Sequence, residues 1–105
     1  MTDKLIVLVT CSGREEAETI ARAVVEERLA ACVNVLPGVR SCYVWEEKLN
    51  WSDEVLLLIK TAQSRFASLQ ARILELHSYD VPEIVAVPIE AGIDKYLDWI
   101  SKSVE

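Results

Sequence analysis

The sequence predicts an α+β domain in which four strands form one antiparallel sheet. The spacing of the apolar residues changes along the chain. Some segments have the near-continuous or alternating pattern of strands, and others have the three-to-four-residue spacing of helices. The segments follow the order strand, helix, strand, strand, helix, strand, helix. The chain has 105 residues, of which 51% are apolar, enough for one domain with its own core. We therefore expect residues 1–105 to form a single domain.

The first strand and helix come from residues 5–32. Residues 5–9 are a continuous apolar, β-prone run. Ser12 followed by Glu15 three residues later fits a capping box, which predicts that a helix begins there. A stripe at helical spacing follows, made of Ala17, Ile20, Ala21, Val24, Val25, Leu29 and Cys32. This stripe predicts a helix whose last turn ends at a buried Cys32.

The middle of the chain reads as a hairpin. Residues 34–45 alternate with the period of a strand, and Pro37 and Gly38 interrupt them in the manner of a bulge. Residues 46–53 are mostly polar, and we expect them to connect the two strands. Residues 54–61 form the returning strand.

The second half adds a helix, a strand and a last helix. Residues 64–77 carry an apolar helical stripe, and Pro82 requires that the helix end before it. Residues 84–87 form a strand that ends at Pro88 or lies at an edge, because proline lacks a ladder donor. Residues 93–104 return to helical spacing. This order is the split βαβ, or ferredoxin-like, arrangement with a C-terminal helix.

Charge and segment length limit the partners. The formal net charge is −6, which disfavours nucleic acid. The apolar run at residues 5–9 is too short to be a signal core or to span a membrane, so we expect no membrane partner and a cytoplasmic protein. Cys11, Cys32 and Cys42 match neither a disulfide framework nor a zinc spacing, and we expect reduced thiols.

Six stretches together resemble the CutA family of divalent-cation tolerance proteins. They are RLAACVN at 28–34, PG at 37–38, YVWEEK at 43–48, LIKT at 58–61, HSYDVPEI at 77–84 and YLDWI at 96–100. The resemblance covers nearly the whole chain. It implies a ferredoxin-like protomer, a homotrimer joined through strand edges with an architecture like that of PII signalling proteins, and association with divalent metal ions. An uncovered apolar sheet face also favours oligomers.

His77, the only histidine, lies at the end of the second predicted helix. It is either a packing residue that interacts with the helix terminus or an imidazole ligand. The resemblance implies a copper site that uses a histidine at this position and an acidic residue after the proline, which is Glu83. We therefore expect weak Cu²⁺ binding at His77 and Glu83, with Cys11 or a backbone group as a third ligand.

Cys11 precedes the first predicted helix, where the helix dipole can lower the pKa of a thiol. It is the best candidate for a reactive or metal-binding thiol. The cysteine of the family's copper site aligns instead with Thr10, and neighbouring strand residues point to opposite faces. A thiol or redox protein that uses Cys11 is therefore an alternative to the metal-associated protein.

The chain shows no pattern typical of an enzyme. The three glycines stand apart, and one histidine without a matched nucleophile supports no catalytic triad. We expect no catalysis and no cofactor-binding loop. One group of residues combines aromatic rings with positive charge: Tyr43, Trp45, Lys48, Lys60 and Tyr79. We expect these to pack in the core and at subunit interfaces; the alternative is a PII-like pocket between subunits for a small anion.

Overall fold

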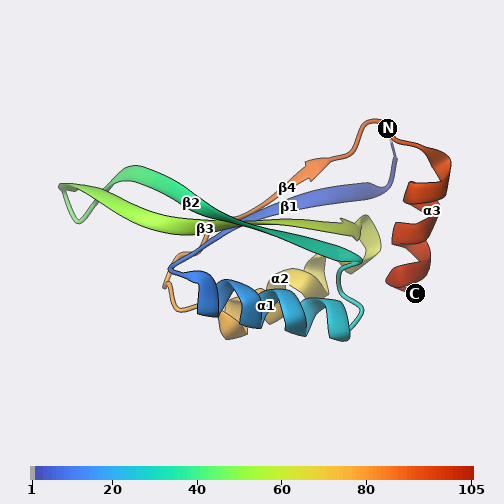
Figure 1. Cartoon of the computed structure of the whole chain (residues 1–105), viewed down its shortest axis with the longest axis horizontal. Helices are drawn as coiled ribbons and strands as arrows, with labels where there is room; N and C mark the ends of the chain where they lie inside the picture. Colours follow the sequence, from blue (N-terminus) through green and yellow to red (C-terminus); the bar gives the residue numbers. More distant parts are fainter. Residues whose placement is uncertain (1) are drawn as a thin grey trace.

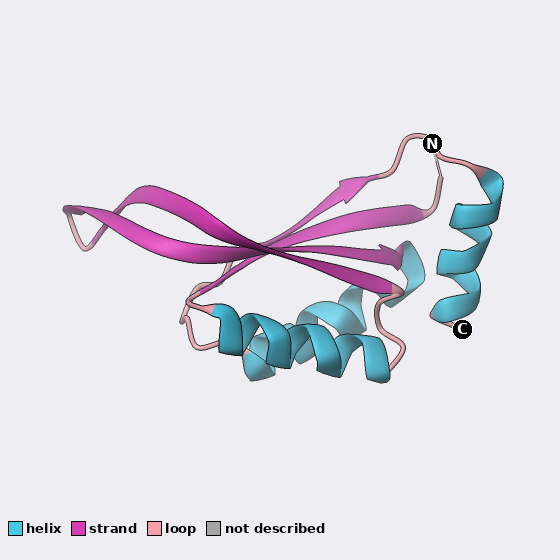
Figure 2. Cartoon of the chain, viewed as in Figure 1, coloured by secondary structure: helices cyan, strands magenta, loops and turns pink. Residues whose placement is uncertain are grey.

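The computed structural model describes residues 2–105 as one antiparallel sheet and three α-helices (Figures 1 and 2). The sheet order is β2-β3-β1-β4. The elements are β1 Lys4–Cys11, α1 Arg14–Glu26, β2 Cys32–Trp45, β3 Lys48–Ala62, the 3-10 turn η1 Gln63–Arg65, α2 Phe66–Leu76, β4 Ile84–Pro88 and α3 Asp94–Ser103. The predicted ferredoxin-like fold is confirmed, and Pro88 ends β4 at the edge of the sheet, as expected.

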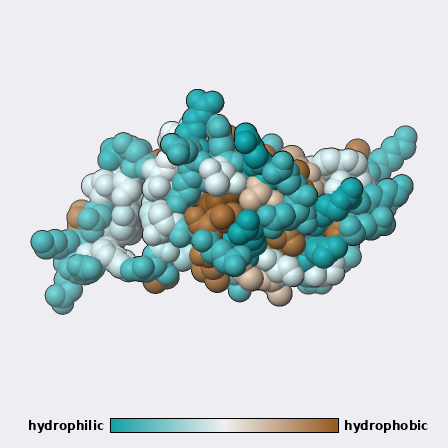
Figure 3. Space-filling model, turned by 90° about the horizontal axis from the view of Figure 1, so that it is seen from below, coloured by the Kyte–Doolittle hydropathy of each residue, from teal (hydrophilic) through white to brown (hydrophobic). Residues whose placement is uncertain are grey.

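The core lies between the sheet and the layer of α1 and α2, which Figure 1 shows beneath the strands. Alternate residues of β1 and β3 point into it and meet the apolar stripes of both helices. Its fully buried side chains include Val7, Val9, Cys11, Ile20, Val24, Leu57, Ile59, Leu69 and Ile73. Figure 3 shows the molecule from the helix side, where hydrophilic side chains surround a smaller hydrophobic patch. The two helices are thus amphipathic, as their stripes predicted.

The opposite face of the sheet is apolar but has no helix over it. Its side chains are half-buried or exposed, and they are Ile6, Leu8, Leu36, Leu56, Leu58, Val85 and Val87. Helix α3 lies at the end of the sheet near the N-terminus (Figure 1). There it packs Ile100 and Val104 on Ala31 and Ala62. The uncovered face therefore remains available for association.

The start and end of α1 differ from the prediction. The predicted capping box of Ser12 and Glu15 is wrong, because the N-cap is Gly13 and the carboxylate that meets Ser12 belongs to Glu16. The helix also ends at Glu26, and Cys32 is the half-buried first residue of β2 rather than the end of the helix. Arg28 has φ 59°, so the chain leaves the helical path before the apolar spacing runs out.

The β2–β3 hairpin is longer than expected. The predicted connection over residues 46–53 is wrong, because only Glu46 and Glu47 form the turn, with φ of 51° and 67°. The predicted bulge is confirmed: the register between β2 and β3 shifts between Leu36 and Val39. Gly38 lies within this shift and has φ 83°, a conformation that costs glycine little.

We predict that Gly38→Ala lowers the free energy of unfolding by about 1 kcal/mol, because a Cβ at this φ meets the backbone. Gly38→Asn should cost less, since asparagine tolerates the left-handed region. Urea denaturation at one fixed protein concentration checks both variants. Equal stability of wild type and Gly38→Ala would show that the bulge adopts another backbone conformation.

Candidate functional site

Three potential metal ligands meet where β1 ends above the helix layer. They are the thiol of Cys11 at the end of β1, the carboxylate of Glu16 in the first turn of α1, and the imidazole of His77 directly after α2. One ligand atom from each lies within 4.8 Å of those of the other two. Cys11 and His77 are buried and Glu16 is half-buried. The fold thus gathers residues that are 61 positions apart in the chain, from Glu16 to His77.

Both ring nitrogens of His77 have protein partners. The backbone N–H of Tyr79 donates to Nδ1 at 3.1 Å, so Nδ1 carries no proton. Nε2 lies 2.7 Å from the carbonyl oxygen of Thr10, which can only accept, so Nε2 donates. Strand β4 pairs with β1 only as far as Val9. The carbonyl of Thr10, just beyond this pairing, accepts its hydrogen bond from His77 instead. The imidazole is therefore neutral and fixed in one tautomer.

Glu16 joins the start of α1 to the segment that follows α2. One carboxylate oxygen accepts from the backbone N–H and the hydroxyl of Ser12, at 3.0 and 3.1 Å. The other accepts from the backbone N–H of Ser78 at 2.8 Å. Burial favours the protonated form of Glu16, but the hydrogen bonds from Ser78 and Ser12 outweigh it and lower the pKa of this carboxyl. Glu16 is therefore charged at neutral pH.

The thiol of Cys11 is completely buried. Burial, with the negative charges of Glu16 and Glu54, raises its pKa to about 12. This direction is opposite to the one expected from its position before a helix, because the thiol points into the core rather than at the free amides of α1. At neutral pH Cys11 is a protonated thiol, and a metal ion would have to displace that proton.

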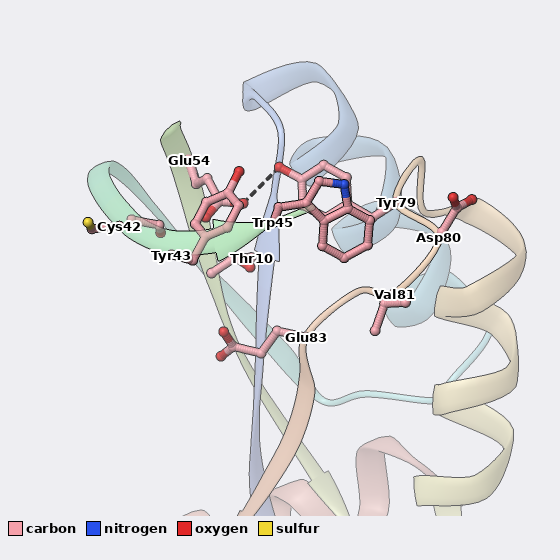
Figure 4. A pocket seen from close by; sticks show the side chains of 10 residues that line it. Thr10, Cys42, Tyr43, Trp45, Glu54, Tyr79, Asp80, Val81 and Glu83 are labelled. Atoms are coloured by element: carbon pink, nitrogen blue, oxygen red, sulfur yellow. Dashed lines mark hydrogen bonds between the residues drawn. The ribbon is translucent and has the colours of Figure 1, made fainter. Parts of the chain in front are cut away.

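Glu83, which was predicted as a ligand together with His77, is not part of this group. It lines a pocket of about 530 Å³ on the other face of the sheet, beside Thr10. The pocket lies where the hairpin passes the segment between α2 and β4 (Figure 4). Thr10 and Cys11 are neighbours in β1 and face opposite sides, so the predicted set of Cys11, His77 and Glu83 is divided between the two faces.

The same pocket collects part of the aromatic set. Tyr43, Trp45 and Tyr79 line it, whereas Lys48 and Lys60 do not. The charged residues on its wall are acidic instead: Glu54, Asp80 and Glu83. The phenol of Tyr79 donates to Glu54 at 2.7 Å, the dashed line of Figure 4. Burial and the Glu54 carboxylate raise the pKa of Tyr79, which keeps it a donor. An anion therefore finds no positive charge among these lining residues.

Sequence reasoning missed Glu16 and Glu54. The sequence pattern places Glu16 in the first turns of a predicted helix and Glu54 at the start of the predicted strand 54–61, and it marks neither as a functional residue. For Glu16 one signal was available: it precedes Ala17, the first residue of the apolar stripe, by one position. For Glu54 none was, because its hydrogen-bond partner Tyr79 lies 25 residues away.

Comparisons with known proteins agree with one another. The family model described as CutA1 divalent ion tolerance protein matches residues 5–103. The divalent-cation tolerance protein CutA of Thermus thermophilus is 50% identical over 98 residues, covering 93% of this chain and 95% of that protein. The chloroplastic protein CutA of Arabidopsis thaliana is 46% identical over 99 residues, covering 94% of this chain and 54% of that protein.

Solved structures give the same result. The divalent cation tolerance protein from Thermus thermophilus superimposes with a TM-score of 0.95 at 48% identity, covering 97% of this chain and 99% of that one. CutA from Xylella fastidiosa reaches 0.97 at 39% identity, covering 99% and 100%. With the fold, the motif order and the family model in agreement, this chain belongs to the CutA1 divalent ion tolerance protein family.

Proposed function

We propose that this chain is a non-catalytic metal-binding protein that responds to divalent transition-metal ions, copper first among them, through Cys11, Glu16 and His77. The observation that carries the proposal is the approach of three different ligand atoms to within 4.8 Å of one another. The name of the Thermus thermophilus relative, a divalent-cation tolerance protein, points in the same direction. Thiolate, imidazole and carboxylate together suit copper and zinc better than magnesium or calcium.

The hydrogen bonds of the site determine how it would bind. His77 must give up the amide of Tyr79 to free the lone pair of Nδ1, because Nε2 carries the proton donated to Thr10, and Cys11 must lose its proton. Both changes cost free energy, so we expect modest affinity and ready exchange. Glu16 is already charged and needs only to turn one oxygen toward the ion. Such a site suits a protein that responds to excess metal rather than one that retains a permanent ion.

Cobalt(II) binding tests the site without thiol oxidation. We predict that Co²⁺ gives a thiolate-to-cobalt charge-transfer band in wild type, that Cys11→Ser abolishes the band, and that Glu16→Gln weakens affinity at least about tenfold. Zn²⁺ competition against the Co²⁺ band then shows whether a second divalent ion occupies the same site. Glu83→Gln is the matched control, because Glu83 lines the separate pocket and should leave Co²⁺ affinity unchanged.

Two outcomes would contradict this site. Undiminished affinity in both Cys11→Ser and Glu16→Gln removes the proposed ligand set. Loss of affinity in Glu83→Gln, with Glu16→Gln unaffected, moves the site to the arrangement of His77 and Glu83 that the family resemblance implied. Circular dichroism of every variant separates loss of binding from loss of fold.

A thiol enzyme built on Cys11 is disfavoured by its environment. The thiolate is the nucleophile in such chemistry, and burial with two acidic neighbours opposes it. The names of the CutA relatives state no catalytic activity. We therefore propose that the protein has no turnover dependent on Cys11.

Alkylation with iodoacetamide at pH 7 measures this difference. We predict that exposed Cys42 is modified first and that buried Cys11 is at least about a hundredfold slower, because its pKa is raised to about 12. Peptide mass spectrometry after timed quenching gives both rates from one sample. Modification of Cys11 as fast as Cys42 would revive the redox alternative.

We also propose that the chain works as a homotrimer. Its uncovered sheet face is apolar, and the hairpin exposes Trp45 on that face and Val44, Leu49 and Trp51 on the other. Exposed apolar surface on this scale marks an association site.

Light scattering coupled to size exclusion should report about three times the chain mass of 11.8 kDa. A charge placed on the uncovered face, Leu58→Glu, should shift the mass toward that of one chain. The exposed control Leu74→Glu, on the outer surface of α2, should not. A wild-type monomer at micromolar concentration would contradict the trimer.

The compartment stays a prediction. None of the helices in residues 2–105 is long and apolar enough to cross a membrane. The Arabidopsis thaliana relative is named chloroplastic, and the Archaeoglobus fulgidus structure is described as periplasmic. We propose the cytoplasm for this chain on the basis of its three unpaired thiols.

A further inference from the structure

Two of the three candidate metal ligands accept hydrogen bonds from consecutive backbone amides of the connector, residues 77–83 between α2 and β4. A carboxylate oxygen of Glu16 accepts from the amide of Ser78 at 2.8 Å, and Nδ1 of His77 accepts from the amide of Tyr79 at 3.1 Å. Both bonds lie within one chain, beside the buried thiol of Cys11 on the side of the sheet that α1 and α2 cover. They therefore do not depend on what covers the opposite face of the sheet.

The two acceptors differ in how many partners they can hold. A neutral imidazole has one lone pair, which here is on Nδ1, and the amide of Tyr79 uses it. A carboxylate has roughly four lone-pair sites on its two oxygens. Glu16 accepts three hydrogen bonds, from the amide and hydroxyl of Ser12 and from the amide of Ser78. A metal ion can thus share Glu16 with Ser78, but it must compete with Tyr79 for His77.

Few other backbone bonds hold the connector in place. Among the described residues, no backbone-to-backbone hydrogen bond involves residues 79–82. Figure 4 shows Asp80 and Val81 on this stretch, and both are exposed. Pro82 has no N–H to donate. The bond from the amide of Tyr79 to His77 is therefore the main restraint on the backbone of this stretch.

We infer that metal binding releases the amide of Tyr79 from His77 while Ser78 stays bound to Glu16, so that the connector after Ser78 changes conformation when the site is occupied. This inference rests on the proposed metal site. Nε2 of His77 keeps its proton and its bond to the carbonyl of Thr10, the kind of outer partner that orients a metal-ligating histidine. In the metal-free protein an amide proton takes the place of the ion at Nδ1. The connector is thus the element that reports whether metal is bound.

Nitrogen NMR of the imidazole tests this inference on the wild-type protein. His77 is the only histidine, so both of its ring nitrogens can be assigned without ambiguity. On addition of diamagnetic Zn²⁺ we expect the Nδ1 signal to move and Nε2 to keep its attached proton. In the same sample, amide hydrogen exchange at Tyr79 should become at least about fivefold faster, the equivalent of one lost hydrogen bond. Exchange at Ser78 should not change.

Two variants test the competition for Nδ1 directly. Tyr79→Pro removes the competing N–H and should bind Co²⁺ about fivefold more tightly than wild type. Tyr79→Phe keeps the amide and loses only the phenol, so it is the matched control and should bind as wild type does. Circular dichroism checks the fold of both variants, and the NMR test needs neither of them.

The outcomes separate this inference from the metal site itself. A Zn²⁺-induced change at Nε2 with Nδ1 unaffected would overturn the inference. So would a Co²⁺ band in wild type together with unchanged exchange at Tyr79 under Zn²⁺, or equal Co²⁺ affinity in wild type and a folded Tyr79→Pro. In these cases the metal site stands. Absence of the Co²⁺ band in wild type would remove the metal site and this inference with it, so the two failures are distinguishable.

Discussion

The position of β1 in the sheet is the constraint on which both candidate sites depend. Strand β1 pairs with β3 along its whole length and with β4 over Leu5–Val9, so its register and the facing of its side chains are fixed from two sides. Cys11 must then point into the helix layer, while Thr10 points to the uncovered face. The thiol group and the aromatic pocket therefore lie on opposite sides of one strand, and neither can shift without the other.

The segment between α2 and β4 connects the two sites through hydrogen bonds. His77 donates to the carbonyl of Thr10 and accepts from the amide of Tyr79, and the phenol of Tyr79 donates to Glu54. The rings of His77 and Tyr79 lie 4.8 Å apart, between centroids. A change in the hydrogen bonds of His77 therefore affects the backbone amide of Tyr79. Through that amide it affects the position of the Tyr79 phenol, which donates to Glu54. The two aromatic side chains and the backbone groups they contact carry this connection across the sheet edge.

The sequence predicted the sheet and the helices well because each has a periodic apolar pattern. Errors arose where a tertiary contact decides the conformation. Ser12 and Glu15 have the spacing of a capping box, yet Glu16 prevails because it also reaches the amide of Ser78. His77 and Cys11 were recognised as chemically competent, but residue spacing does not tell which face of the sheet each occupies. Glu54 meets its partner Tyr79 far along the chain, and no local pattern indicates that contact.

The single extra residue at the bulge decides which side chains the far half of the hairpin turns toward Glu54. Before the bulge, Leu36 stands opposite Leu56; after it, Val39 stands opposite Glu54, so three steps along β2 match two along β3. Even-numbered residues of β2 share the uncovered face before this point and odd-numbered residues do so after it. If the same chain paired without this shift, Gly38 would stand opposite Glu54, and Cys42 and Val44 would take the places of Tyr43 and Trp45 on the uncovered face. The backbone conformation at Pro37 and Gly38 therefore determines whether the pocket wall on the hairpin is aromatic.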